Sequence, residues 1–285
     1  AKFFYSLAAT LIVAVGIGGW FYSQRGLYAT GIGEQRTVTL VDGSVIELNA
    51  GTRIKVRYDD HERAIYLLQG QALFSVAKNP ARPFIVASNG TYVRAVGTQF
   101  DVYKKSRGTV VTVVEGRVAV TAGTSVGAIA PPGSEPVMDR HSPETDIEPM
   151  SANPPARKAA PDAGTSHISV PSKSEVLLGA GEQLVVTQAM SPSPRPANVE
   201  AVTAWTQQRL VFDYTPLTEV AEEFNRYNHR RLVIEDSGLR EFHISGSFSS
   251  TDPTLLLRFL REQRGILVHE TDSEIRISRH AAGVG

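Results

Sequence analysis

The chain has 285 residues, of which 42% are apolar and 20% charged, so it is long enough for two folded domains of ordinary composition. Its 29 Lys and Arg residues balance 29 Asp and Glu residues, which excludes the overall basic excess that is typical of nucleic-acid-binding proteins. The absence of cysteine excludes disulfides, thiolate catalysis and cysteine-based metal sites.

An uncharged apolar run opens the chain. Residues 3–22 contain no Asp, Glu, Lys or Arg, and twenty helical residues at about 1.5 Å each would cross a hydrocarbon core of about 30 Å. Aromatic residues stand at both ends of the run, where the membrane interface favours them. Residues 1–25 are therefore predicted to be a single transmembrane helix with its flanks, and a signal peptide is the alternative.

Residues 26–124 show the pattern of an all-β domain. Asp42 and Gly43 form a turn signal between two alternating apolar segments, which predicts a β-hairpin. Further segments rich in β-branched and aromatic residues follow, separated by Gly70, Gly90 and Gly116. No helical period of useful length appears, so we expect a sandwich or a short β-solenoid.

Proline divides the rest of the chain, since twelve of the sixteen prolines fall between residues 131 and 196. Residues 125–174 lack any hydrophobic period and are predicted to be a proline-rich linker or insertion. A returning β-strand is expected within 175–190, followed by a spacer at 191–201.

Residues 202–285 predict a small α+β domain of order βαββαββ, with both helices on one face of a sheet. Leu217, Val220, Ala221 and Phe224 have helical spacing after Pro216, and a second helix is expected after Pro253. The complete fold class is therefore a transmembrane helix, an all-β domain and a small α+β domain. The two domains carry opposite net charge, because residues 26–125 hold 12 basic and 8 acidic residues and residues 200–285 hold 10 and 13. A solvated surface is the default interpretation of this difference, and docking of the two domains or steering of a partner are the alternatives.

Several long segments resemble the periplasmic region of FecR-type anti-sigma regulators. They are GIGEQRTVTLVDGSVIELNAGT at 31–52, GQALFSVAKNPARPFIVASNGTYVRAVGTQFDVY at 70–103 and VVEGRVAV at 113–120. AWTQQRLVFDYTPLTEVAEEFNRYN at 204–228 and FHISGSF at 242–248 are similar to the short domain at the N-terminus of secretins and TonB-dependent receptors.

The resemblance implies a single-pass inner-membrane signal transducer with most of its chain in the periplasm. Its partners would be the periplasmic signalling domain of a TonB-dependent outer-membrane receptor, envelope proteases and an extracytoplasmic-function sigma factor. The sigma factor would be bound by a cytoplasmic segment that lies outside the given sequence. The regulated process would be the uptake of iron or another nutrient. A different class of function, a structural or assembly module of an envelope complex, is the alternative, because the C-terminal domain also resembles the secretin type.

No catalytic motif with credible spacing is present, so the chain is not expected to be an enzyme or to bind a metal, a cofactor or nucleic acid directly. One bond invites a chemical hypothesis. At Gly97 and Thr98 a hydroxyl follows an unhindered carbonyl, which would allow an N-to-O acyl shift and self-cleavage, as in some members of the resembled family. The competing interpretation is that Gly97 simply permits a bulge.

Strand edges of the C-terminal domain are expected to accept a strand from the partner. The apolar residues that would supply specificity are equally well explained as domain core. They are Leu217, Val220, Phe224, Leu232 and Ile234.

Overall fold

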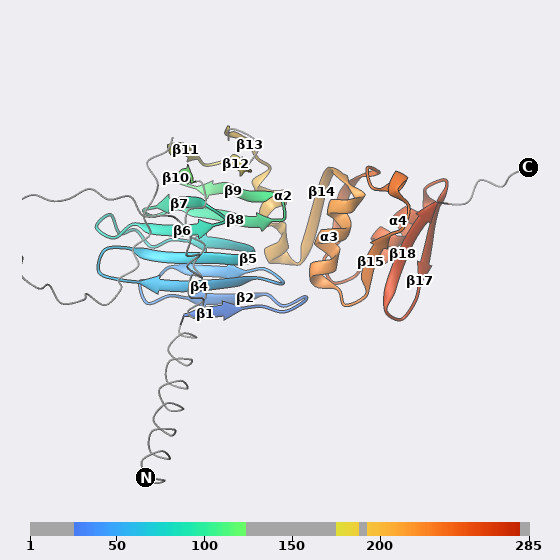
Figure 1. The fold of residues 1–285 in the computed structure, drawn as a ribbon, viewed down its shortest axis with the longest axis horizontal. Coiled ribbons are helices and arrows are strands. Elements are labelled where there is room, and N and C mark those ends of the chain that lie inside the picture. The colour runs from blue at the N-terminus through green and yellow to red at the C-terminus, as the bar shows by residue number, and fades with distance from the viewer. Residues whose placement is uncertain (1–25, 124–174, 188–192, 280–285) are drawn as a thin grey trace, which may run out of the picture.

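The computed structural model describes residues 26–123, 175–187 and 193–279. These residues form two units that lie side by side (Figure 1). The first, which we call the β-sandwich unit, comprises residues 26–123, 175–187 and 195–196. The second, the C-terminal unit, comprises residues 199–279.

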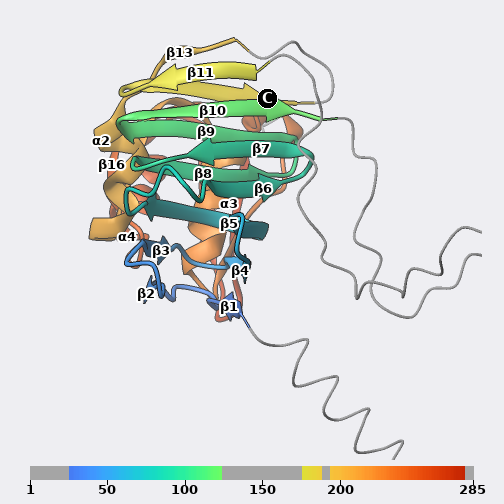
Figure 2. The same cartoon turned by 90° about the vertical axis from the view of Figure 1, so that its left-hand side faces the viewer.

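The β-sandwich unit contains two sheets that share one long strand. The strands of the first sheet, in spatial order, are β1 (Leu27–Ala29), β4 (Arg53–Tyr58), β5 (Arg63–Ser75), β6 (Phe84–Ser88), β7 (Thr91–Ala95), β10 (Arg117–Ala122) and β11 (Glu175–Gly179). Those of the second are β2 (Arg36–Thr39), β3 (Val45–Leu48), the shared β5, β8 (Gln99–Lys105), β9 (Gly108–Glu115), β12 (Glu182–Val186) and β13 (Arg195–Pro196). Figure 2 shows them stacked from β1 and β2 at one end to β11 and β13 at the other.

Gly70 allows β5 to belong to both sheets. Its φ is +82°, a conformation that glycine adopts without steric cost. A Cβ at this position would lie 2.7 Å from the Cα of Thr52, so no other residue fits. Residues before Gly70 pair with β4 and β6, and residues from Gly70 onward pair with β3 and β8. The bend therefore folds one strand across two layers.

The core of this unit lies between the two sheets. Phe74 of β5 stacks on Phe100 of β8 with ring centroids 5.2 Å apart, and it meets Phe84 of β6 edge to face at 6.0 Å. All three side chains are fully buried. The predicted hairpin around Asp42 and Gly43 is confirmed as the antiparallel pair β2 and β3.

The C-terminal unit alternates short strands and helices. Its elements are α2 (Val199–Thr203), the 3-10 helix η1 (Ala204–Gln207), β14 (Arg209–Pro216), α3 (Leu217–Tyr227), β15 (Arg231–Ile234), the 3-10 helix η2 (Ser237–Leu239), β16 (His243–Ser249), α4 (Thr254–Glu262), β17 (Ile266–Glu270) and β18 (Glu274–Arg279). The strands form two separate sheets, one of β14 and β16 and one ordered β15-β18-β17. Helices α3 and α4 each contact both sheets and lie between them (Figure 1).

The fold class expected from the sequence therefore requires correction. Strands dominate the described residues, and the C-terminal unit is not a single sheet with both helices on one face. Alternating apolar residues indicate which face of a strand is buried, but they do not specify its neighbour. Here β15 pairs in parallel with β18, more than 40 residues further along, and β14 pairs with β16.

The predicted membrane span, residues 1–25, lies outside the described residues, as does the predicted proline-rich linker. Among the residues that are described, none of the helices combines the length and the apolar character needed to cross a bilayer.

Candidate functional site

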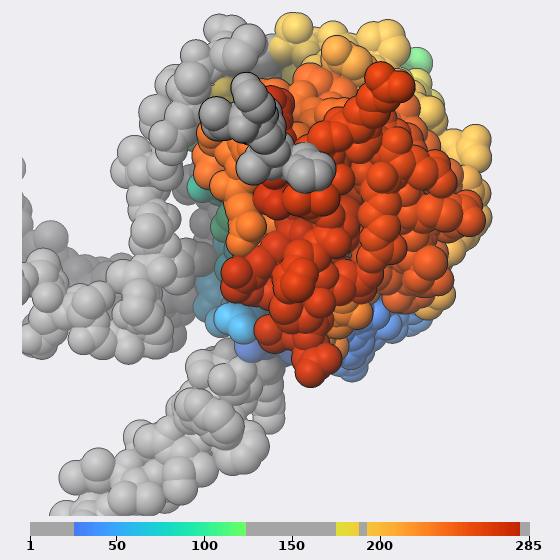
Figure 3. Space-filling view, turned by 90° about the vertical axis from the view of Figure 1, so that its right-hand side faces the viewer, coloured from blue at the N-terminus to red at the C-terminus, as the bar shows by residue number. Residues whose placement is uncertain are grey.

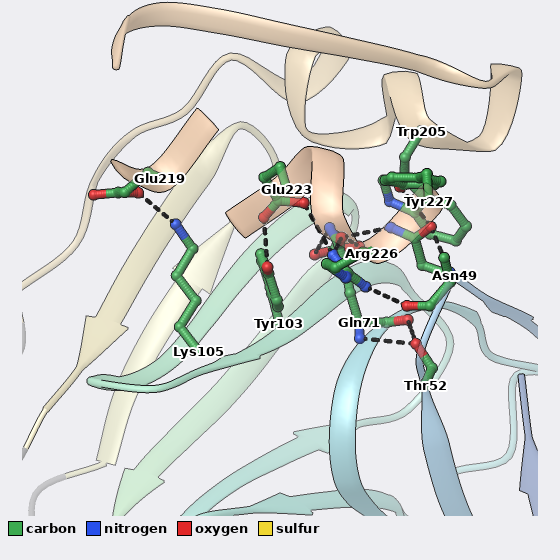
Figure 4. A network of polar contacts seen from close by, with 12 residues as sticks. Asn49, Thr52, Gln71, Tyr103, Lys105, Trp205, Glu219, Glu223, Arg226 and Tyr227 are labelled. Carbon is green, nitrogen blue, oxygen red and sulfur yellow. Dashed lines mark hydrogen bonds and ion pairs between the residues drawn. The ribbon is translucent and has the colours of Figure 1, made fainter. Parts of the chain in front are cut away.

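The junction between the two units holds a group of largely buried polar side chains that come from distant parts of the chain. Helix α3 forms its C-terminal side. One face of α3 is buried in the core of its own unit through Leu217, Val220 and Phe224. Glu219, Glu223 and Arg226 recur at helical spacing on another face and meet the β-sandwich unit (Figure 4).

Arg226 is the centre of this junction. Its guanidinium donates hydrogen bonds to the backbone carbonyl of Ala50 at 2.9 Å and to Oε1 of Gln71 at 3.3 Å. It also forms an ion pair with Glu223 at 3.1 Å and lies over the Tyr103 ring, 4.8 Å from the centroid. Only 14% of the Arg226 side chain is exposed, so these partners replace water almost completely.

Further contacts tie α3 and η1 to the sandwich around Arg226. Tyr227 donates its hydroxyl hydrogen to Oδ1 of Asn49 at 2.6 Å. The amide of Gly33 donates to the carbonyl of Arg226 at 3.0 Å, and Nε2 of Gln35 donates to the carbonyl of Trp205 at 2.6 Å. The units are therefore joined by backbone as well as side-chain hydrogen bonds.

Two further contacts join α3 to β8, an exposed ion pair and a more buried hydrogen bond. Lys105 pairs with Glu219 at 2.9 Å, and Tyr103 donates a hydrogen bond to Glu223. Burial, followed by the negative charge of Glu223, raises the pKa of Tyr103 above its usual value, so this hydroxyl stays protonated.

Asp101 is the unusual group of the junction. It lies on β8, is 1% exposed, and accepts hydrogen bonds from Nε2 of Gln71 at 3.1 and 3.2 Å. Burial raises its pKa to about 7, although the hydrogen bonds from Gln71 and the charge of Arg226 favour the carboxylate.

A cavity of about 260 Å³ opens beside this network, between the two units. Its walls come from β8, η1, β14 and α3, and they include Asp101, Tyr103, Trp205, Phe212 and Glu223. A pocket lined by residues of both units therefore remains at the junction.

The five apolar residues predicted as partner contacts belong to the core of the C-terminal unit. Leu217, Val220, Phe224 and Leu232 are at most 4% exposed, and Ile234 packs against the same cluster. The first four side chains are buried and Ile234 is partly buried, because α3 and β15 pack against each other within the unit. The interpretation as domain core, left open from the sequence, is the one that the burial supports.

The bond between Gly97 and Thr98 lies where the chain enters β8. Gly97 has φ +156°, and a Cβ there would lie 3.0 Å from Cβ of Lys78. The Thr98 side chain is 9% exposed, and its hydroxyl is buried without a hydrogen-bond partner among the described residues. Hydrogen bonds to the Val96 and Thr98 carbonyls fix the backbone on both sides.

The sequence did not single out Asn49, Gln71, Asp101, Tyr103 or Arg226. A signal was present for two of them. Asp101 is a charged residue between the apolar Phe100 and Val102, and Arg226 follows Glu223 by three residues on the predicted helix. These residues come together only because the two units dock, so their proximity could not be predicted from the sequence.

Comparison with known protein families finds a match within the first unit. A family model described as FecR protein matches residues 26–119, which confirms the FecR resemblance over this part of the chain. Two crystal structures of a candidate anti-sigma factor from Parabacteroides distasonis ATCC 8503, at 1.65 and 2.50 Å resolution, share its fold. Each is 22% identical and covers 90% of this chain and 99% of its own, with TM-scores of 0.66 and 0.65 respectively. None of the curated proteins compared with the chain matches it.

Proposed function

From the FecR domain that residues 26–119 form, we propose that this protein is an anti-sigma regulator. It receives a signal from an outer-membrane TonB-dependent transducer and relays it to an extracytoplasmic-function sigma factor that controls uptake of iron or another nutrient. The proposal puts the described units in the periplasm, at the inner membrane. The observation that carries it is the FecR domain itself, joined to a second unit by a polar junction suited to transmit displacement.

A free strand edge offers the receptor a place to dock. β17 is the outer strand of the sheet ordered β15-β18-β17 and, among the described residues, pairs only with β18. It lies at the end of the molecule away from the sandwich, among the red atoms that face the viewer in Figure 3. Leu267 on β17 and Leu255 on α4 are 44% and 47% exposed, so apolar contacts accompany the unpaired backbone groups.

The register identifies which amides face outward. The Thr271 amide donates to the Glu274 carbonyl, so alternate residues before it, including Leu267, direct their backbone groups toward β18. The N–H of Val268 therefore points to the free edge. A signalling domain that adds a strand here would accept this hydrogen bond, and the junction would carry the resulting displacement of the C-terminal unit to the FecR domain.

Val268→Pro should weaken binding of the receptor's periplasmic signalling domain about tenfold or more, because proline removes an outward N–H without breaking the β17–β18 ladder. Val268→Ala is the matched control, since it loses a comparable side-chain contact but keeps the N–H. Isothermal titration calorimetry of the purified protein with the signalling domain measures both.

Two results would count against the proposal in different ways. Native affinity of Val268→Pro would remove β17 from the docking site and leave the transducer function intact. Absence of binding by the unaltered protein, with both partners shown to be folded by circular dichroism, would refute the transducer function.

The buried Thr98 hydroxyl also supports a self-cleavage step, which we propose for the Gly97–Thr98 bond. The Thr98 Oγ1 attacks the Gly97 carbonyl carbon, the C–N bond breaks, and the hydroxyl proton ends on the released amine. Water then hydrolyses the ester, leaving a carboxylate on Gly97 and a free N-terminus at Thr98. The new chain ends would be accessible to envelope proteases.

Thr98→Ala should abolish this cleavage, and Thr98→Ser, which keeps a hydroxyl, should retain it. Gly116→Ala should suppress it as well, because a Cβ at Gly116 would lie 2.8 Å from the Thr98 methyl and displace that side chain. Gly181→Ala is the control, since Gly181 has a similar positive φ but no atom near the added Cβ. Intact-mass spectrometry detects the fragments, and a single full-length species from the unaltered protein would end the hypothesis.

A further inference from the structure

The geometry points to a junction controlled by a proton on Asp101: the two units dock more tightly when this carboxyl is protonated and separate more readily when it is ionised. This regulation is independent of the partner and of the cleavage step proposed above. It concerns how firmly the C-terminal unit is held against the FecR domain.

Asp101 lies where the two units meet. Asp101 is fully buried in the assembled junction but belongs to the β-sandwich unit, and part of its cover comes from the other unit. Gln71 connects Asp101 to the C-terminal unit. Its amide nitrogen donates to Asp101, and its amide oxygen accepts hydrogen bonds from Arg226 of that unit and from Asn49. Separation of the units would expose the carboxyl to water.

Charged and polar side chains from both units face Asp101. From α3 these are the cation Arg226, the anion Glu223 and the neutral Tyr227; from η1 it is the indole of Trp205. From the sandwich it is the neutral amide of Gln71. Arg226 forms an ion pair with Glu223, and the negative charge of Glu223 itself opposes ionisation of Asp101. Arg226 therefore compensates only in part for the loss of water around an Asp101 carboxylate.

These surroundings determine whether docking strengthens or weakens as the pH rises. In the docked state burial raises the Asp101 pKa to about 7, whereas an exposed aspartate has a pKa of about 3.9. The docked state therefore binds a proton more tightly than the open state. Docking is strongest when the pH is below the open-state pKa of about 3.9. It weakens as the pH rises from there to the docked-state pKa of about 7, and it changes no further at higher pH. Between pH 5.5 and pH 8 the docking constant should fall about 30-fold.

The Gly33 amide offers a direct readout, because it donates to the Arg226 carbonyl across the junction. Hydrogen exchange of the full chain, corrected for the intrinsic pH dependence of exchange, gives the opening equilibrium at this site. We expect its protection factor to fall about 30-fold from pH 5.5 to pH 8. The amides of the β5–β8 pair around Phe74 and Phe100 report whether the sandwich stays folded.

Asp101→Asn separates this cause from any other source of pH dependence in the same interval. The variant cannot ionise, so its Gly33 protection should be nearly independent of pH. Asp213→Asn, at an exposed residue of β14, is the control and should behave as the unaltered protein. Equal Gly33 protection at both pH values in the unaltered protein would overturn the inference, as would the same pH-dependent fall in Asp101→Asn.

Discussion

Replacing Arg226 by alanine should open the junction while both units stay folded. The variant loses hydrogen bonds to Ala50 and Gln71 and the ion pair with Glu223, and it uncovers the Tyr103 ring. Removing one partner of a largely buried ion pair leaves the other charge uncompensated, so we expect a loss of about 3 kcal/mol in docking free energy. Small-angle X-ray scattering should show a larger radius of gyration, with an unchanged circular dichroism spectrum.

Arg276→Ala is the matched control for this experiment. Arg276 also forms ion pairs, in its case with two carboxylates, those of Glu235 and Glu274, but 48% of its side chain is exposed. Exposed pairs contribute about 1 kcal/mol or less because water screens them. Its scattering profile should match that of the unaltered protein, and an unchanged profile for Arg226→Ala would mean that the apolar contacts alone hold the units together.

The second large effect is expected for Phe224→Asp, which should unfold the C-terminal unit. Phe224 is 2% exposed, and its ring centroid lies 6.1 Å from that of Phe212 and 6.4 Å from that of Phe248. The substitution combines a cavity, which costs about 3–5 kcal/mol, with a buried carboxylate that has no partner. Circular dichroism should lose its helical component and keep the β-sheet signal of the sandwich.

Glu222→Ala is the control on the same helix, because Glu222 is exposed and its loss should leave the spectrum unchanged. The experiment also tests the first interpretation of Phe224 as a partner contact. A native spectrum with loss of receptor binding would return Phe224 to the partner surface and contradict its place in the core.

Local patterns predicted much of the secondary structure. Asp42 and Gly43 specify a tight turn between alternating strands, and the hairpin of β2 and β3 forms there. Apolar residues at helical spacing after Pro216 predict α3, which runs from Leu217 to Tyr227. These signals act within about ten residues, so they survive without knowledge of the rest of the chain.

The pairing of the strands was not predictable in this way. The expected single sheet became two because β14 pairs with β16 and β15 with β18. A strand with one apolar face satisfies its side chains equally well beside several neighbours. Only the packing of α3 and α4 between two layers decides among them.

At the candidate site, too, some features follow from the sequence and others only from the tertiary structure. The amino-acid sequence by itself determined the FecR character of the first unit, the opposite net charges of the two units and the Gly97–Thr98 dipeptide. Tertiary structure alone decided that Asp101, Gln71 and Arg226 meet, since they come from β8, β5 and α3. The ionisation of Asp101 depends on the water that docking removes from around it. That exclusion requires both units in place, and no local pattern of residues encodes it.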